Sequence, residues 1–211
     1  MRVVSASVIA LILAAGASSR MGFPKGLLPW GGSTVLQQIL GQVREAGLEN
    51  IVLVSGAHHE QLISLAQGEA IRICHHPGWE QGMGSSLSRG IAFVENHFPE
   101  AEAILVLLSD QPFVTEKYLQ DMLKARQASP SAMIASRYGD AAGVPSLFPR
   151  AFWEELKALP PTQGAKAFIV ARPNQYMALE TGFPLIDIDT PESYQRALAL
   201  AGYPPTPNTS K

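Results

Sequence analysis

The chain has 211 residues, of which 46% are hydrophobic and 16% charged, a balance typical of a folded globular protein and not of a disordered one. Its 16 Lys and Arg against 18 Asp and Glu give a net charge of -2, so no basic excess is present to neutralise a nucleic-acid backbone or to hold a membrane surface. The single cysteine, Cys74, excludes an internal disulfide and favours a reducing, cytoplasmic location.

Residues 8–15 form an apolar run preceded by Arg2 and followed by small residues, a pattern that also occurs in secretory signals. The run is shorter than the roughly 18–20 apolar residues of a membrane-spanning helix. We interpret it as a strand buried on both faces, because the most specific pattern in the chain follows it directly. Cleavage of this segment would remove the strand on which that pattern depends.

Short apolar runs alternate with amphipathic stretches up to residue 130. The strands and helices are predicted, in chain order, at Val8–Leu13, Thr34–Ala46, Ile51–Val54, Glu60–Ala66, Ile71–Cys74, Ser85–Phe98, Ala103–Leu108 and Thr115–Gln127. Gly47 is a stop signal for the first helix, and Thr115 is a candidate N-cap of the last. This order predicts an α/β fold, with a Rossmann-like, doubly wound, mostly parallel sheet and helices on both faces.

The pattern changes after residue 130, where a small β-hairpin and helix insertion is predicted around a turn at Gly139-Asp140. The elements expected from there on are strands at Ala132–Ser136, Val144–Phe148, Tyr176–Leu179 and Leu185–Ile188, and helices at Pro149–Leu159, Gly164–Ala171 and Pro191–Ala201. Because no linker or repeat is visible, residues 1–201 are predicted to form one domain, and the proline-rich residues 202–211 a mobile tail.

A glycine-rich segment follows the first strand: Leu13-Ala14-Ala15-Gly16-Ala17-Ser18-Ser19-Arg20-Met21-Gly22-Phe23-Pro24-Lys25. Ligands bind at the carboxyl ends of the strands in open α/β sheets, and the backbone N–H groups of such loops form cradles for anions. Arg20 can grip phosphate oxygens with two N–H groups, and Lys25 adds a point charge. The segment matches neither the Gly-x-Gly-x-x-Gly dinucleotide fingerprint nor a Walker A loop. It indicates another kind of phosphate site, and a tight turn carrying solvated cations is the alternative.

The segment resembles the signature of the MobA-like nucleotidyltransferases, and most closely that of the molybdenum cofactor cytidylyltransferase branch. The resemblance extends over about residues 8–200 and includes Gly82-Met83-Gly84-Ser85-Ser86-Leu87, Leu108-Ser109-Asp110-Gln111-Pro112, Gly143-Val144-Pro145-Ser146-Leu147-Phe148, Gly164-Ala165-Lys166 and Asp187-Ile188-Asp189-Thr190-Pro191-Glu192. It implies transfer of a nucleoside monophosphate from an NTP to a small phosphorylated acceptor, with Mg²⁺ and with release of pyrophosphate.

The resemblance also implies a role for individual residues. The nucleotide would be held by Leu13, Ala14, Ala15, Gly16, Arg20, Gly22 and Lys25 from the first segment and by Gly82, Gly84, Ser85 and Ser86 from the second. Catalysis would rest on Arg20 at the β- and γ-phosphates, Lys25 near the α-phosphate and Asp110 at the metal, and an ionised acceptor phosphate would need no general base. The guanylyl branch usually has Gly where this chain has Ala15, so the residue favours CTP over GTP.

Three acidic residues are candidate metal ligands. Asp110 follows an apolar strand, and Mg²⁺ prefers one or two carboxylates together with phosphate oxygens; a turn cap before Pro112 is the alternative. Asp187 and Asp189 lie two apart on a predicted strand, so both project to one face. Because Asp189 or Thr190 is also a candidate N-cap of the last helix, Asp187 is favoured as the second ligand.

Gly143 and Lys166 lie in segments that resemble the family's acceptor site. Lys166 stands where the family has Arg, so two-pronged phosphate recognition is lost, and the acidic residue that usually precedes it is missing. The acceptor can therefore differ from molybdopterin. The pairs His58-His59 and His75-His76 lack the spacing of a structural zinc site, and the tryptophans, Trp79 among them, are predicted to pack or to anchor loops.

Three functions follow from these observations. The favoured one is Mg²⁺-dependent cytidylyl transfer to a molybdopterin-type acceptor. The second is transfer from GTP, or from an NTP to another small phosphate such as a sugar phosphate. The third is a non-catalytic protein that binds a cofactor and delivers it to a molybdoenzyme. The presence of Arg20, Lys25 and Asp110 together favours an enzyme.

Overall fold

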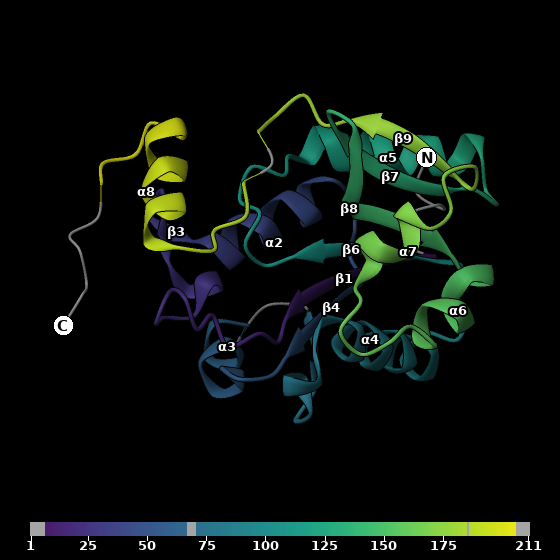
Figure 1. The fold of residues 1–211 in the computed structure, drawn as a ribbon, viewed down its shortest axis with the longest axis horizontal. Helices are drawn as coiled ribbons and strands as arrows, with labels where there is room; N and C mark the ends of the chain where they lie inside the picture. Colours follow the sequence, from purple (N-terminus) through teal and green to yellow (C-terminus); the bar gives the residue numbers. More distant parts are fainter. Residues whose placement is uncertain (1–6, 67–70, 185, 206–211) are drawn as a thin grey trace.

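The computed structural model describes residues 7–66, 71–184 and 186–205, and a seven-stranded sheet forms its centre (Figure 1). The strands lie in the order β5 (Ile71–His75), β4 (Ile51–Ser55), β1 (Val8–Ala14), β6 (Ala103–Leu108), β8 (Ala141–Pro149), β7 (Met133–Tyr138) and β9 (Tyr176–Glu180). β8 is antiparallel to β6 and β7, and all other neighbouring pairs are parallel. The predicted mostly parallel α/β fold is confirmed.

Helices cover both faces of this sheet (Figure 1). One face carries α2 (Val35–Glu45), α5 (Glu116–Ala128) and α8 (Pro191–Leu200), with Leu62 from α3 (His59–Ala66). The other carries α4 (Met83–His97), α6 (Trp153–Lys157) and α7 (Ala165–Val170). No helix in the described ranges is long and apolar enough to cross a membrane.

Strand β1, which lies between β4 and β6, explains why both faces of the sheet must be covered. Its alternate residues Ala10 and Ile12 belong to one hydrophobic core, and Ile9 and Leu11 belong to the other. Side chains alternate between the faces of a strand, so a continuous apolar run buries itself only between two layers of helices. Gly90 lets α4 approach closely, since a Cβ there would lie 2.8 Å from atoms of Leu11 and of a valine in β4.

The strand order reverses next to β1. The chain runs outward from β1 to β4 and β5, and then returns to β6 on the opposite side of β1. In such sheets a crevice opens beyond the carboxyl ends of the strands at the point of reversal. The segments that follow β1 and β6 therefore lie on the two sides of this crevice.

Local side chains decide where several helices begin. Thr34 caps α2 in a capping box with Gln37, and Thr115 caps α5 as predicted. Thr190 caps α8, with a proline as the first helical residue. α4 has no side-chain cap and begins two residues before the predicted Ser85. Its free N–H groups are instead satisfied from a distant loop, as described below.

The described part of the strand predicted at Leu185–Ile188 is not a strand. Leu185 lies outside the described residues, and residues 186–188 adopt no regular structure. Ile188 is fully buried and donates its backbone N–H to the Asp110 carbonyl over 3.1 Å. The apolar side chain thus anchors the segment to the core, and the strand prediction was wrong because no neighbouring strand pairs with these residues.

The hairpin predicted after residue 130 forms, but it extends the central sheet, because β8 pairs with β6. The predicted helix Pro149–Leu159 is divided into a 3₁₀ turn, η3 (Arg150–Phe152), and α6. A second hairpin, β2 (Pro29–Trp30) with β3 (Ser33–Thr34), was not predicted. Its turn is Gly31-Gly32, where both φ angles are positive, as a two-residue hairpin turn requires.

Ordered structure continues past residue 201, where the tail was predicted to begin. The Tyr203 ring meets Trp30 edge-on with 5.4 Å between centroids, and its N–H donates to the Leu198 carbonyl. Tyr194 of α8 donates its hydroxyl to the Pro29 carbonyl over 2.6 Å. These contacts hold α8 against the β2–β3 hairpin. Residues 206–211 of the predicted tail lie outside the described residues.

Candidate active site

The loop after β1 folds back on itself through Ser18. Ser18 has a φ of +51°, and its carbonyl accepts the N–H groups of Met21 and Gly22 at 2.9 and 3.1 Å. Its hydroxyl oxygen accepts the backbone N–H of Lys25 over 3.3 Å. This turn brings Lys25, the first residue of the 3₁₀ turn η1 (Lys25–Leu27), beneath the carboxyl edge of the sheet.

Several backbone donors of this loop remain available. Among the described residues, the N–H groups of Gly16, Ala17 and Ser19 donate to no protein acceptor. A Cβ built on Gly16 would meet no atom within 4 Å, so open space lies in front of its backbone. Successive free N–H groups beside open space form a concavity suited to an anion.

Lys25 and Asp110 meet in the crevice although 85 positions separate them in the sequence. The Lys25 Nζ lies 3.0 Å from Asp110 Oδ2, and the same ammonium group donates to Asp189 Oδ1. The side chains of Lys25 and Asp110 are only 17% and 16% exposed, and that of Asp189 is 38% exposed. The Lys25 ammonium group is therefore paired with the carboxylates of both Asp110 and Asp189, at a site that is partly shielded from water.

Burial and charge act against each other on these groups. Burial raises the pKa of the Asp110 carboxyl; the Lys25 charge lowers it without cancelling this effect, and the Asp187 charge raises it further. Burial alone would lower the pKa of Lys25, but its pairing with Asp110 and Asp189 leaves that pKa above its ordinary value. Lys25 is therefore a firmly protonated cation between two acids.

The two C-terminal acids take different partners. Asp189 pairs with Lys25, and its Oδ2 lies 3.5 Å from Arg20 Nη2. Asp187 Oδ1 instead accepts from the Gln111 amide over 2.8 Å. The N-cap of α8 is Thr190, whose hydroxyl accepts the Ser193 N–H. Thr190, one of the two predicted caps, therefore caps the helix, which leaves the Asp189 carboxylate to share Lys25 with Asp110.

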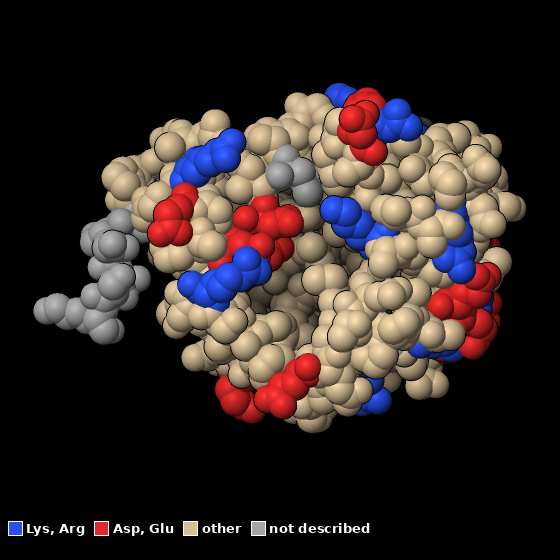
Figure 2. Space-filling model, viewed as in Figure 1, with Lys and Arg blue, Asp and Glu red and all other residues tan. Residues whose placement is uncertain are grey.

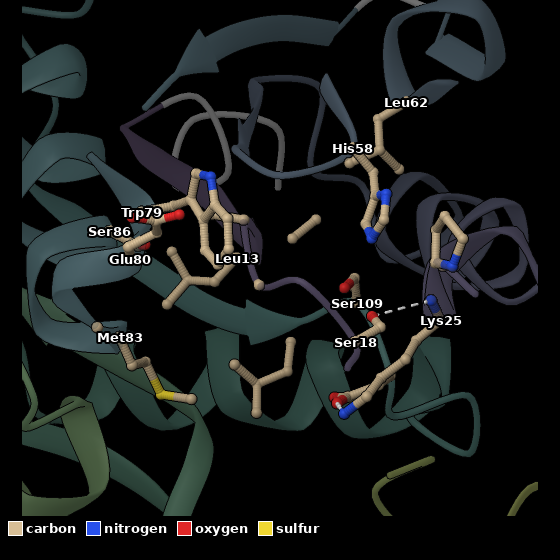
Figure 3. Close-up of a pocket in the computed structure, with 18 residues that line it drawn as sticks. Leu13, Ser18, Lys25, His58, Leu62, Trp79, Glu80, Met83, Ser86 and Ser109 are labelled. Carbon is tan, nitrogen blue, oxygen red and sulfur yellow. Dashed lines mark hydrogen bonds and ion pairs between the residues drawn. The ribbon is translucent and has the colours of Figure 1, made fainter. Parts of the chain in front are cut away.

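A cavity of about 360 Å³ opens beside these groups. Figure 2 shows a hollow near the middle of this face, with acidic and basic side chains together on its rim. In Figure 3, Ser18, Lys25 and His58 lie on one side, and Trp79 and Glu80 on the other. The cavity is thus lined by the ends of β1 and β6 and by the segments that follow β4 and β5.

Most of the residues predicted to bind nucleotide line this cavity: Leu13, Ala14, Ala15, Gly16, Lys25, Gly82 and Ser86, together with the predicted metal ligand Asp110. Four other predicted residues, Arg20, Gly22, Gly84 and Ser85, are not among its lining residues. The Arg20 side chain is 70% exposed and turned toward Asp189. Arg20 therefore contacts Asp189 without lining the cavity.

Gly84 and Ser85 hold the start of α4 in place. Their N–H groups donate to the Pro161 carbonyl at 2.8 and 3.2 Å, which satisfies donors that a helix start otherwise leaves free. The Ser85 hydroxyl donates to the Gly82 carbonyl over 2.7 Å and lies 2.9 Å from a ring nitrogen of His76. The structure gives these residues packing partners in place of an open ligand face.

Sequence reasoning did not select His58, Trp79, Glu80 or Met83, all of which line the cavity. Trp79 and Glu80 belong to the 3₁₀ turn η2 (Trp79–Gln81), four residues beyond β5. His58 follows β4, and its Nε2 lies 3.0 Å from the Ala17 carbonyl in the glycine-rich loop. Their positions just after parallel strands were the available signal, since such strands end at one edge of the sheet.

A second cavity, also of about 360 Å³, adjoins the first and shares Leu13, Met83 and Leu108 with it. It contains the predicted acceptor residues Gly143 and Lys166, and also Gln111, Tyr138 and Asp187. The residues predicted to bind the acceptor thus lie in a cavity next to the one that most of the predicted nucleotide-binding residues line. Both cavities lie at the ends of β1 and β6.

The histidine pairs remain apart from these cavities except at His58. His59 stacks on His75 with 3.8 Å between ring centroids, and Cys74 is buried. Within the described ranges no group of three His, Cys, Asp or Glu side chains forms a ready metal cage.

The family model for the MobA-like NTP transferase domain matches residues 10–176. This chain belongs to that family. The resemblance inferred from the motifs is thereby confirmed, and the match covers both cavities up to Lys166.

Three relatives illustrate the range of the family's names. Nicotine blue oxidoreductase of Paenarthrobacter nicotinovorans is 38% identical over 108 residues, which are 50% of each chain. Purine catabolism protein PucB of Bacillus subtilis is 26% identical over 199 residues, 89% of this chain and 94% of that one. Molybdenum cofactor cytidylyltransferase of Escherichia coli is 24% identical over 185 residues, 87% and 92% of the two chains. The chain spans half the length of the first of these relatives.

Solved structures share the fold over most of its length. Rv0371c of Mycobacterium tuberculosis superposes with a TM-score of 0.77 at 28% identity, covering 92% of this chain and 97% of that one. The same protein in complex with manganese gives a TM-score of 0.74 at 26% identity, covering 92% and 98%. The neighbouring folds include nucleotidyltransferases from other organisms.

Proposed function

We propose that this protein transfers CMP from CTP to a phosphorylated acceptor of the molybdopterin type and releases pyrophosphate. The observation that carries the proposal is the 3.0 Å contact between Lys25 Nζ and Asp110 Oδ2 beside the glycine-rich loop. A partly buried cation, a partly buried carboxylate and free backbone N–H groups thus surround one cavity. That combination suits a triphosphate with its divalent ion, and family membership supports it.

The two ends of the first cavity suit different parts of a nucleotide (Figure 3). The triphosphate would lie at the end with Ser18 and Lys25, and the base at the end with Trp79 and Glu80. A carboxylate accepts from the exocyclic amino group of cytosine or guanine, which uracil lacks. Ala15, with its methyl group in the wall of the cavity, supports CTP over GTP.

The residues present also fit a divalent cation. Asp110 Oδ1 is buried and accepts no hydrogen bond in the described structure. A buried acceptor without a partner is costly unless a ligand completes it. Asp110, with Asp189 as second carboxylate and with Asp187 nearby, would hold Mg²⁺ together with phosphate oxygens. When bound, this ion would offset negative charge on the reacting phosphates.

The chemistry required of the chain itself is positioning and charge stabilisation. Lys25 and the N–H groups of Gly16 and Ala17 would bind phosphate oxygens on which charge builds as the leaving pyrophosphate departs. The acceptor would lie in the second cavity, with Lys166 and Gly143 at its phosphate, and would meet the α-phosphate near Met83, which both cavities share. An ionised acceptor phosphate attacks without a general base.

The proposal also covers the domain, the cellular location and the partner of the enzyme. Both cavities are built between Leu13 and Asp187, which supports one catalytic domain over residues 1–201. The lone buried thiol of Cys74 supports a reducing, cytoplasmic location. A molybdoenzyme would receive the product.

The test measures pyrophosphate released when the protein is incubated with Mg²⁺, one NTP and molybdopterin. We expect release with CTP and much slower release with UTP, and the Asp110→Asn variant serves as the inactive control. Release with GTP alone would assign the guanylyl reaction instead. Release only with a sugar phosphate as acceptor would contradict the molybdopterin assignment. No release with any NTP, together with tight binding of the cofactor, would mean a carrier.

A further inference from the structure

Lys25 occupies the space between the carboxylates that are proposed to hold the metal. Its Nζ contacts Asp110 Oδ2 at 3.0 Å and also Asp189 Oδ1. Arg20 adds a second positive charge, 3.5 Å from the other Asp189 oxygen. The cation position is thus already filled by a side chain of the protein.

This arrangement has a consequence for a free divalent ion. Two neighbouring carboxylates attract a cation strongly, but an ammonium group between them neutralises one charge and repels an incoming ion. The exposed fractions of 17% for Lys25 and 16% for Asp110 mean that water screens this repulsion only in part. A divalent ion must therefore displace Lys25 or bind beside it at reduced affinity.

A triphosphate changes this balance. The ammonium group of Lys25 lies at the end of a flexible four-carbon side chain. The Lys25 backbone N–H, in contrast, is held by the Ser18 hydroxyl. Phosphate oxygens bound on the neighbouring N–H groups of the loop would offer Lys25 an alternative partner of higher charge. The ammonium group can then move to the phosphates while η1 stays in place, which leaves Asp110 and Asp189 open.

We propose that Lys25 is a built-in counter-ion that closes the Asp110–Asp189 pair to free divalent cations until a triphosphate draws it away. Metal and nucleotide would then enter together, and the protein without nucleotide would bind the metal weakly. This inference rests on the proposed function for the identity of the triphosphate, but the closure of the carboxylate pair can be measured without any nucleotide.

The experiment is a titration of the full-length protein with Mn²⁺ in the absence of nucleotide, followed by the electron paramagnetic resonance signal of the free ion. We expect weak binding by the unmodified protein. Lys25→Met, which keeps the apolar side chain and removes the charge, is expected to tighten binding by about tenfold or more. Lys25→Arg keeps the positive charge and is expected to bind as weakly as the unmodified protein.

Two further variants locate the effect. Asp110→Asn introduced into Lys25→Met is expected to remove the gain, because it deletes a carboxylate of the pair. Lys117→Met is the control for loss of charge alone, since Lys117 contacts one carboxylate, Asp121 at 2.9 Å, and lines neither cavity. It removes the same charge and is expected to leave Mn²⁺ binding unchanged.

The proposal is overturned if Lys25→Met binds Mn²⁺ no more tightly than the unmodified protein. It is equally overturned if Lys117→Met gives the same gain, or if the gain survives Asp110→Asn. Circular dichroism checks folding, and Lys25→Gln replaces Lys25→Met if the latter does not fold. If Lys25→Met binds Mn²⁺ more tightly but the unmodified protein transfers no CMP, the proposed function alone is contradicted. If the unmodified protein transfers CMP but Lys25→Met binds Mn²⁺ no more tightly, this inference alone is contradicted.

Discussion

Gly84 donates its backbone N–H to the carbonyl of Pro161 over 2.8 Å, which ties the start of α4 to the loop before α7. α4 borders the first cavity and α7 carries Lys166 of the second. The position of Lys166 relative to the first cavity therefore depends on a backbone contact between segments that are remote in the sequence.

Replacement of Gly84 by alanine should destabilise this contact. The added Cβ would lie 2.4 Å from the Gln163 carbonyl oxygen and 2.5 Å from that of Pro160, so the backbone must move. We expect a loss of about 1–3 kcal/mol in unfolding free energy by urea denaturation. Gly41→Ala in α2 is the control, since no atom lies within 4 Å of its Cβ, and it should stabilise the helix by about 0.5–1 kcal/mol. Equal stability of Gly84→Ala and the unmodified protein would contradict the contact.

Gly16→Ala should separate binding from folding. Its Cβ meets no protein atom within 4 Å and its φ is not positive, so we expect an unchanged melting temperature. The methyl group would stand where phosphate oxygens are proposed to approach the loop. We therefore expect kcat/KM for CTP to fall by about tenfold or more, as when a preorganised contact to the reacting phosphates is lost. An unaltered kcat/KM would place the triphosphate elsewhere.

Loss of either charge at the centre of the site should abolish most of the turnover. Lys25→Ala and Asp110→Ala are each expected to lower kcat by on the order of 10²-fold or more, because fixed charge at the reacting phosphates is removed. Single-turnover kinetics at saturating CTP would distinguish this from weaker binding. Near-normal turnover in both variants would refute the proposed roles.

Glu80 should influence which base is accepted. If its carboxylate accepts the cytosine amino group, Glu80→Ala removes a charged hydrogen bond, and kcat/KM for CTP falls by about 10- to 100-fold. UTP offers no amino group, so its own low kcat/KM should change little. The measurement is the ratio of kcat/KM for CTP to that for UTP in the two proteins. A ratio that does not change would exclude Glu80 from base recognition.

Tyr118 should make stability fall at high pH. Burial raises its pKa from 10.0 to about 12, and its hydroxyl bonds to Ser136 over 2.8 Å and to the Leu179 carbonyl over 3.1 Å. The folded state therefore holds this proton more tightly than the unfolded state does. The stabilisation is complete below pH 10 and is lost as the pH rises toward 12, by on the order of 2–3 kcal/mol.

Tyr118→Phe isolates this contribution. At pH 8 the variant should be less stable by about 1 kcal/mol, because the hydroxyl contacts are missing. Urea denaturation at pH 8 and at pH 11.5 measures both proteins. The difference between them should shrink or reverse at the higher pH, and a constant difference would contradict the raised pKa.

The sequence by itself determined most of the elements and the family. Apolar periodicity placed β1, β4 and β6 within about a residue, and Thr34, Thr115 and Thr190 marked helix starts, because caps and periodicity depend on neighbours within one turn or strand. The glycine-rich motif likewise identified the loop that borders the first cavity.

Only the tertiary structure decided which residues share the site. Asp189, and not the favoured Asp187, shares Lys25 with Asp110, while Gly84 supports a helix start beside a cavity that Trp79 lines. Both arrangements depend on contacts between segments that lie far apart in the sequence, and the spacing of residues along the chain does not predict such contacts. The free energy of such contacts exists only once the strands have paired and brought their carboxyl ends to one edge, so no local pattern can reveal it.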